Sequence, residues 1–364
     1  MNFILKRSAS AVVTMFLVSV FCFLAFSVIR GDPAVFAAGT DAAHGQLEAL
    51  REEMGLNKNI IARYFDWLSS FFAGNPGNSL RFRGEAISAL IRTRLPVTFS
   101  LALLSLFFIA LISVPVSLLT INREGNIVSF AEGKGGDRLV NFITAAGISV
   151  PGFFMGLLFI WVFGLGAKIF VPGSYVDYRE NFWGFIRYLC FPALAIAVPN
   201  AAVMIKFLRG SLFQELQSDY VRTARSKGGS RLYAMRRHAL KNALVPAITV
   251  LGMIIAEVFS GSIIIEQVFT IPGAGRLLIA AIGSRDYPLI QTLMVYIAFI
   301  VVFANTLADI AIMIIDPRIN NPALKGRGML FLKGICIRGL IPVLSALKGG
   351  VLTPSARIRQ GRDI

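Results

Sequence analysis

The sequence predicts an all-α polytopic membrane protein with six transmembrane helices, and three observations predict it. The 364 residues are 55% hydrophobic, with a mean hydropathy of +0.69. Only 15% are charged, whereas soluble domains carry about 25%. Six apolar runs, each nearly free of charge, reach the ~18 residues that a membrane-spanning helix needs. These features argue against a soluble enzyme, a disordered chain and a disulfide-stapled scaffold.

The predicted spans follow one another at 8–29, 95–121, 139–167, 188–205, 242–265 and 288–315. The first follows Lys6 and Arg7 and resembles a signal peptide cleaved near residue 38. Its apolar run is longer than the ~7–15 residues of a signal peptide, which favours an uncleaved span. Pro151 in the third span predicts a kink, because proline removes a backbone hydrogen bond. A static kink is slightly favoured over a flexing point.

The Lys and Arg residues are divided unevenly between the two sides that six spans create. Segments 1–7, 122–138, 206–241 and 316–364 hold 23 of them, and the segments on the other side hold 13. Because Lys- and Arg-rich loops stay on the cytoplasmic side, both termini and the loop 206–241 are predicted to be cytoplasmic. The net charge of +16 therefore indicates membrane topology rather than nucleic-acid binding.

The long outer segment, residues 30–94, carries apolar residues at helical spacing over 47–54 and 60–68. This spacing predicts one or two short amphipathic helices on the outer face. The turn-rich stretch 74–78 follows them.

The loop between the fourth and fifth spans is the most informative stretch. Gly228 and Gly229 break a helix there, and Ser230 can cap a second one. The apolar faces predicted for the two helices are Leu212, Leu216, Tyr220 and Ala224, then Leu232, Met235, Ala239 and Ala243. Two short helices joined by glycines suit docking into a groove of a soluble partner. A basic connector held against lipid headgroups is the alternative, and composition alone weighs the two equally.

Residues 219–228 and 238–243 closely resemble the Glu-Ala-Ala loop of permeases of ATP-binding-cassette importers, specifically the dipeptide/oligopeptide branch. The general pattern Glu-Ala-Ala-x3-Gly-x9-Ile-x-Leu-Pro falls here on Arg222, Thr223, Ala224, Gly228, His238, Leu240 and Lys241. Its Glu and its final Pro are replaced as they are in the peptide branch. Further stretches match in order and spacing at 31–33, 52–79, 149–154, 266–276, 285–288 and 309–319. The tail beyond Ile319 matches nothing in the family.

The resemblance implies a permease subunit of a peptide importer in the inner (cytoplasmic) membrane of a bacterial cell. Such a chain forms the translocation pathway with a second, related permease. Two cytoplasmic ATPase subunits hydrolyse ATP beneath them, and a periplasmic or lipid-anchored binding protein delivers the substrate. The permease itself is then no enzyme and needs no cofactor. The implied parts are 1–94, the first helix and its periplasmic amphipathic segment; 95–319, a permease domain with five helices; and 320–364, a basic cytoplasmic tail.

The resemblance also implies two groups of site residues. Those expected to couple to the ATPase are Asp219, Tyr220, Arg222, Thr223, Ala224, Lys227, Gly228, His238 and Asn242. Those expected at the pathway or gate are Glu266, Gly273, Gly275, Asn305 and Asp309, together with Glu257, for which the family gives no role and only the cost of a carboxylate at bilayer depth gives the expectation.

Each of the gate candidates also has a plainer interpretation. A carboxylate at bilayer depth costs about 2.5–3.5 kcal/mol, so Glu257 should face the pathway or a polar partner. Asn305 and Asp309 share one helix face, where a structural hydrogen-bond site is favoured over gating. Glu266 and the two glycines form either an element of the outer gate or only the connection between two spans.

Other chemistry finds little support in the sequence. The three cysteines are far apart, there are two histidines, and no GxxxxGK[ST] phosphate loop occurs. No metal site is expected. Rival functions are import of a nickel chelate, oligosaccharide, glutathione or peptide antibiotic by the same family, an ion-coupled secondary transporter using Glu257 and Asp309, and a membrane-embedded enzyme. The segment 329–347 is either a basic element at the membrane surface or an unstructured tail.

Overall fold

The computed structural model describes residues 2–28, 57–82, 84–123 and 136–315, with four isolated positions between 45 and 52. Residues 1–312 form one compact unit, which the following paragraphs describe. Of the second unit, 313–364, only residues 313–315 are described, as the end of a helix. The predicted tail and most of the predicted helix at 47–54 therefore lie outside the described residues.

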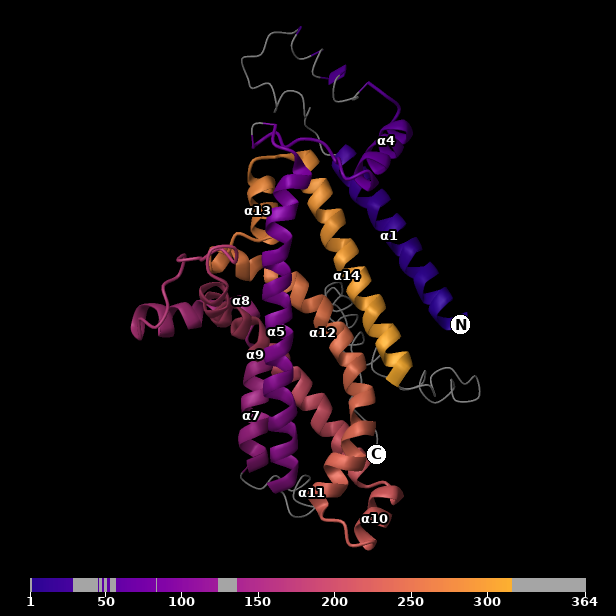
Figure 1. Cartoon of the computed structure of the whole chain (residues 1–364), viewed down its shortest axis with the longest axis vertical. Helices are drawn as coiled ribbons and strands as arrows, with labels where there is room; N and C mark the ends of the chain where they lie inside the picture. The colour runs from indigo at the N-terminus through magenta and orange to yellow at the C-terminus, as the bar shows by residue number, and fades with distance from the viewer. Residues whose placement is uncertain are drawn as a thin grey trace, which may run out of the picture. The chain divides into compact units, whose positions relative to one another are not determined.

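Helices make up nearly all of the described chain, and Figure 1 shows their arrangement. They are α1 (Asn2–Val28), α4 (Ile60–Phe72), α5 (Ile87–Arg123), α7 (Gly136–Ser149), α8 (Gly152–Phe159), the π-helix η1 (Ile160–Gly166), α9 (Phe182–Leu216), α10 (Asp219–Ser226), α11 (Arg231–Ala234), the π-helix η2 (Met235–Ala239), α12 (Leu240–Val268), α13 (Ala274–Gly283) and α14 (Tyr287–Ile315). The one β-bridge among the described residues joins Asn78 and Ala86.

Five helical runs in the described chain are long and apolar enough to cross a membrane: α1, α5, α9, the run from α11 through η2 to α12, and α14. The predicted third span becomes two pieces, because the chain bends by 101° between α7 and the run α8–η1. The break lies at Pro151, so the kink expected there is confirmed. The all-α polytopic fold is also confirmed, with the sixth crossing present only if the bent pair counts as one span.

Small residues allow the central helices to approach closely. α9 packs along α5 and also contacts α7, α8 and α12. Its buried positions include Ala193, Ala195, Ala197, Ala201 and Ala202. A Cβ added to Gly147 of α7 would lie 2.9 Å from the Cβ of Ala202, so glycine is needed at this crossing. Close approach through small residues is how membrane helices gain packing energy when lipid removes the hydrophobic driving force.

Helix α1 is attached to the rest of the unit through α4 and α14. The hydroxyls of Ser19 and Tyr64 are 2.9 Å apart, and the Phe23 and Tyr64 rings lie 5.3 Å apart. The Phe71 ring of α4 then packs on Tyr296 of α14, with centroids 4.7 Å apart. The amphipathic helix predicted over 60–68 is thus confirmed as α4, which joins the first and last spans. Figure 1 shows α4 and α13 at one end of the bundle and α10 and α11 at the other.

Candidate functional site: the helix pair, the Glu266 junction and the α12 face

The predicted break between α10 and α11 is a Schellman motif, a helix ending closed by two backbone hydrogen bonds. Gly228 has φ +87°, in the left-handed region that favours glycine. Its N–H donates to the carbonyl of Arg225 at 3.0 Å, and the N–H of Gly229 donates to Ala224 at 3.2 Å. The Ser230 side chain then accepts from Tyr233 N–H at 3.2 Å and caps α11, as the sequence predicted.

The buried face of the helix pair differs from the predicted one in α10. Val221 is 1% exposed and packs with Ala234 and Ala239, whereas Tyr220, which was expected on this face, is 38% exposed. The Tyr220 hydroxyl donates to Glu215 at 2.5 Å. Two effects raise the pKa of Tyr220 above its usual value: partial burial of the side chain is the larger, and the hydrogen bond to Glu215 is the smaller. In the second helix the prediction was right, because Met235, Ala239 and Ala243 are all buried.

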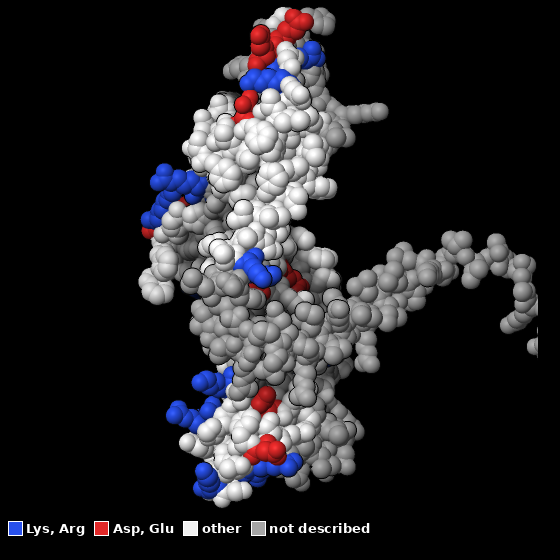
Figure 2. Space-filling view, turned by 90° about the vertical axis from the view of Figure 1, so that its right-hand side faces the viewer, with Lys and Arg blue, Asp and Glu red and all other residues white. Residues whose placement is uncertain are grey.

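The predicted coupling residues form a mostly exposed polar surface on α10, on the turn that follows it, and on η2 and the start of α12. Of the nine, only Ala224 and His238 are partly covered, and the others are exposed. Asp219 and Arg222 lie one turn apart, with their charged atoms 3.7 Å from each other. Lys and Arg side chains gather at the lower end of the face drawn in Figure 2. Exposed side chains on a firmly closed turn leave this surface available to another molecule.

The second group of predicted residues centres on Glu266, which is completely buried near the end of α12. One of its oxygens accepts from the hydroxyl of Thr98 in α5 at 2.6 Å, and the other accepts from Arg276 N–H at 3.0 Å. Thr98 accepts in turn from Ala274 N–H at 2.9 Å. The carboxylate therefore sits at the N-terminus of α13, where free N–H groups stabilise negative charge.

Gly273 and Gly275 are brought against this carboxylate. A Cβ on Gly273 would collide with the Glu266 carboxylate, and one on Gly275 would collide with the backbone of Ile263. The two glycines thus let the start of α13 approach Glu266. The structure brings together three of the predicted gate residues, and each has a structural reason to be there.

The structure shows a second buried carboxylate, Asp286. It lies in the stretch 285–288 that resembles the family, but it was not among the predicted site residues. It accepts from the hydroxyl of Ser79 at 2.5 Å and from Arg81 N–H at 3.1 Å, and it caps α14 through Leu289 N–H at 3.3 Å. An Asp just before a helix that begins Tyr-Pro is a capping signal that could have identified it. Ser79 lies 207 residues away along the chain, and no local pattern could have indicated that contact.

Glu257 lies on an exposed face of α12, next to Met253 and Ser260 on the helix surface. The described part of the chain gives its carboxylate no hydrogen-bond or ion-pair partner. It is two residues from both Ile255 and Phe259, so at 3.6 residues per turn it points to the opposite side of the helix from them. The alternative of a polar partner on another span of this chain therefore has no support among the described residues.

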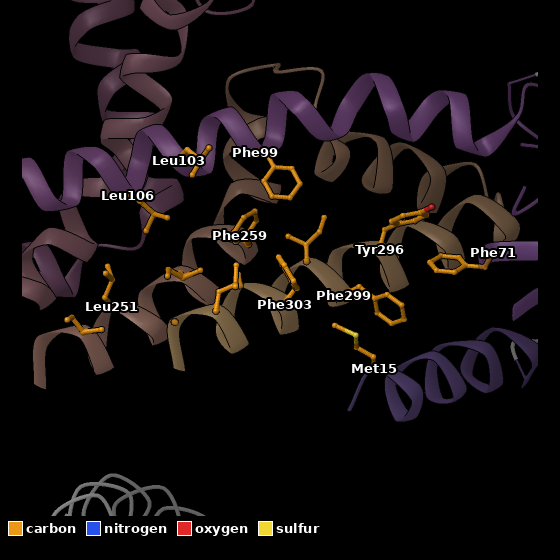
Figure 3. A pocket seen from close by; sticks show the side chains of 16 residues that line it. Met15, Phe71, Phe99, Leu103, Leu106, Leu251, Phe259, Tyr296, Phe299 and Phe303 are labelled. Atoms are coloured by element: carbon orange, nitrogen blue, oxygen red, sulfur yellow. The ribbon is translucent and has the colours of Figure 1, made fainter. Parts of the chain in front are cut away.

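The opposite side of α12 lines an apolar cavity of about 720 Å³, shown in Figure 3. Ile255 and Phe259 face it from α12, and Phe99, Tyr296 and Phe303 face it from α5 and α14. Met15 of α1 also lines it. The exposed carboxylate and the apolar cavity thus divide α12 into two sides of different character.

Asp309 pairs with Arg7, which ties α14 to α1. Asn305, one turn earlier, is partly buried on the same helix. Neither lies in the Glu266 junction, so the six predicted gate residues fall in three separate places. Among the described residues, no three His, Cys, Asp or Glu side chains gather closely enough to hold a metal ion.

Comparison of the sequence with known proteins identifies the family to which the chain belongs. Residues 125–321 match the model of the binding-protein-dependent transport system inner membrane component, and residues 1–102 match the model of the N-terminal part of such membrane components. Similar chains include a probable peptide ABC transporter permease of Sinorhizobium fredii, 36% identical, and a putative peptide transport system permease of Brucella suis, 35% identical. The oligopeptide transport system permease AppB of Bacillus subtilis is 31% identical.

Each of these three alignments covers 87% of this chain and 98% of the relative. The family match alone spans more than half of the sequence. The exposed helix pair, the residues of the Glu266 junction and all of the spans except the part of α5 beyond residue 102 lie within the matched regions. The chain belongs to the family of binding-protein-dependent transport system inner membrane components, and it is a multi-pass inner membrane protein.

Proposed function

We propose that this chain is the permease subunit of an ATP-driven, binding-protein-dependent importer of dipeptides or oligopeptides. The observation that carries the proposal is the α10–α11 pair, whose turn is closed by its own backbone and whose polar side chains are exposed. A short rigid helix with an exposed polar face can fill a groove of a soluble partner. The names of the three relatives, each a peptide permease, support the substrate class.

In this proposal the helix pair docks on a cytoplasmic ATPase, and both termini are cytoplasmic. A second, related permease completes the pathway, a second ATPase serves that permease, and a periplasmic or lipid-anchored binding protein delivers the peptide. ATP is hydrolysed on the ATPase subunits. The sequence itself carries no phosphate-binding loop for that chemistry.

Glu257 is assigned to the pathway side of α12. An exposed carboxylate in a spanning helix is costly against lipid, so it needs water or a polar partner from outside this chain. A peptide presents a cationic amino terminus, which a carboxylate attracts. Import of another solute by the same family remains the second candidate, because a shared scaffold does not define its substrate.

The test is reconstitution of the chain with its partner permease, its ATPases and its binding protein in liposomes. We expect ATP-dependent accumulation of labelled di- or oligopeptides, and ATPase activity stimulated by peptide-loaded binding protein. Accumulation of a different solute, with no peptide bound by the cognate binding protein, would overturn the peptide assignment. Transport without ATP would overturn the importer assignment.

A further inference from the structure

Helix α13 is held at its start by the buried carboxylate of Glu266, and at its end by hydrogen bonds that the Arg81 guanidinium and the Asp286 backbone N–H donate to its last carbonyls. At its start, Glu266 of α12 and Thr98 of α5 share hydrogen bonds with the N–H groups of Ala274 and Arg276. Glu266 is 0% exposed and Thr98 is 7% exposed. Three helices therefore meet in one buried hydrogen-bonded set, from which water is nearly excluded.

The other end of α13 is tied to the outer turn formed by residues 78–86. Asp286 accepts from the hydroxyl of Ser79 and the N–H of Arg81, and the Arg81 guanidinium donates to the carbonyl of Ala280 at 2.6 Å. The turn is closed by its own backbone, because Ser79 N–H donates to Glu85 at 2.9 Å. A displacement of this turn therefore pulls on the end of α13.

The hydrogen bonds at both ends of α13 resist gradual sliding of this helix against the elements to which it is bound. Withdrawing Thr98 from both Glu266 and α13 would leave its buried hydroxyl, a buried carboxylate oxygen of Glu266 and the N–H of Ala274 without these partners, which is costly away from water. The short helix and its two end contacts should then move together rather than stretch. Packed elements of this kind shift between discrete positions.

We propose that α13 is a rigid strut that carries displacement of the outer turn 78–86 to helix α12, and that Thr98 is the positioning residue that locks the strut to both α12 and α5. The inference rests on the proposed function, since the displacement would come from a binding protein docked on the outer side. Through α12 it reaches the face that carries Glu257. Thr98 stands in an apolar span, and no motif of the sequence pointed to it.

The test uses the full reconstituted complex and compares Thr98→Val with Thr98→Ser, which keeps the hydroxyl. The matched control is Thr93→Val on the same helix, whose hydroxyl bonds only to its own helix, at the carbonyl of Leu90, 2.9 Å away. Ser79→Ala probes the other end of the strut. Three quantities are measured: the amount of complex, its basal ATPase rate, and the stimulation of that rate by loaded binding protein.

We expect Thr98→Val and Ser79→Ala to lower the stimulation at least about fivefold, the lower end of couplings between distant sites, with basal rate and complex amount unchanged. Thr98→Ser and Thr93→Val should behave as wild type. Wild-type stimulation in Thr98→Val overturns the strut, and so does an equal loss of basal rate or of complex. Absence of stimulation in the unmutated complex would instead contradict the proposed importer function.

Discussion

The turn between α10 and α11 offers the sharpest test of the coupling assignment, because its two glycines are required for different reasons. Gly228 holds φ +87°, and a Cβ added there would meet no atom within 4 Å. A substitution at Gly228 thus costs conformational strain alone. Gly229 has no such φ, but its Cβ would lie 2.8 Å from the carbonyl oxygen of Ala224, the acceptor of its own N–H bond.

The magnitude follows from these two observations. A side chain in the left-handed region costs about 1–3 kcal/mol, and a β-branched one such as Val at Gly228 lies at the upper end, at roughly 2–3 kcal/mol. Asn tolerates this region, so Gly228→Asn should cost only a few tenths of a kcal/mol. Gly229→Ala should cost about 1 kcal/mol, because the clash opens the hydrogen bond to Ala224. A cost of about 1–3 kcal/mol lowers the equilibrium constant for closing the turn about 5- to 150-fold.

The assay is copurification of the ATPase subunits with the permease, together with hydrolysis stimulated by loaded binding protein. Association should fall in the order wild type, Gly228→Asn, Gly229→Ala, Gly228→Val. The amount of permease in the membrane should stay constant, because no predicted or observed span includes Gly228. Wild-type association in Gly228→Val would refute the assignment, and so would a loss in Gly228→Asn as large as in Gly228→Val.

Glu257→Gln should lower uptake per assembled complex, and unchanged uptake would remove this carboxylate from the pathway. A double-mutant cycle of Arg7→Ala with Asp309→Ala should give a coupling of about 0.5–1 kcal/mol in the free energy of unfolding, because the side chains are 46% and 29% exposed and solvent screens them; strictly additive losses would mean that the pair contributes nothing. Cysteines placed at Ser230 and Ser284, both exposed, should react from opposite sides of the membrane in a chain without its own cysteines. Labelling of both from outside would contradict the topology.

Much of this fold could be predicted because the bilayer makes strong demands on a sequence. A spanning helix must be long, apolar and nearly free of charge, so composition alone located the spans. The turn at Gly228 was predictable for a similar local reason, since glycine and a following Ser are chemical requirements of that turn. The buried face of α10, in contrast, was predicted wrongly. A four-residue period was extended from α9 through Tyr220, but α9 ends at Leu216 and the phase restarts in α10, which buries Val221.

The junction of Glu266, Thr98 and the start of α13 could be predicted only in part from the sequence. Glu266 and the glycines of its turn stood out locally, whereas Thr98 is 168 residues from Glu266 and looks like one polar residue in an apolar run. The size of the bend at Pro151 was likewise out of reach. Proline predicts that a helix breaks, but the 101° angle depends on where α8 packs. Gly156 of α8 lies against Ile265 and Phe269, which fixes that position.

The pairing of Arg7 with Asp309 has a consequence for how the chain is made. The two residues are 302 positions apart, and at synthesis rates of about 5–20 residues per second Asp309 emerges about 15–60 s after Arg7. The aromatic contacts of α4 with α14 likewise wait for the synthesis of Tyr296 and Phe299, shortly before Asp309. During this interval the first helix lies in the bilayer without its contact to α14, and its main contact is with α4. Synthesis of the last helix thus completes the docking of the first, and a chain cut short before Tyr296 lacks both the aromatic contacts and the ion pair that join α4 and α1 to α14.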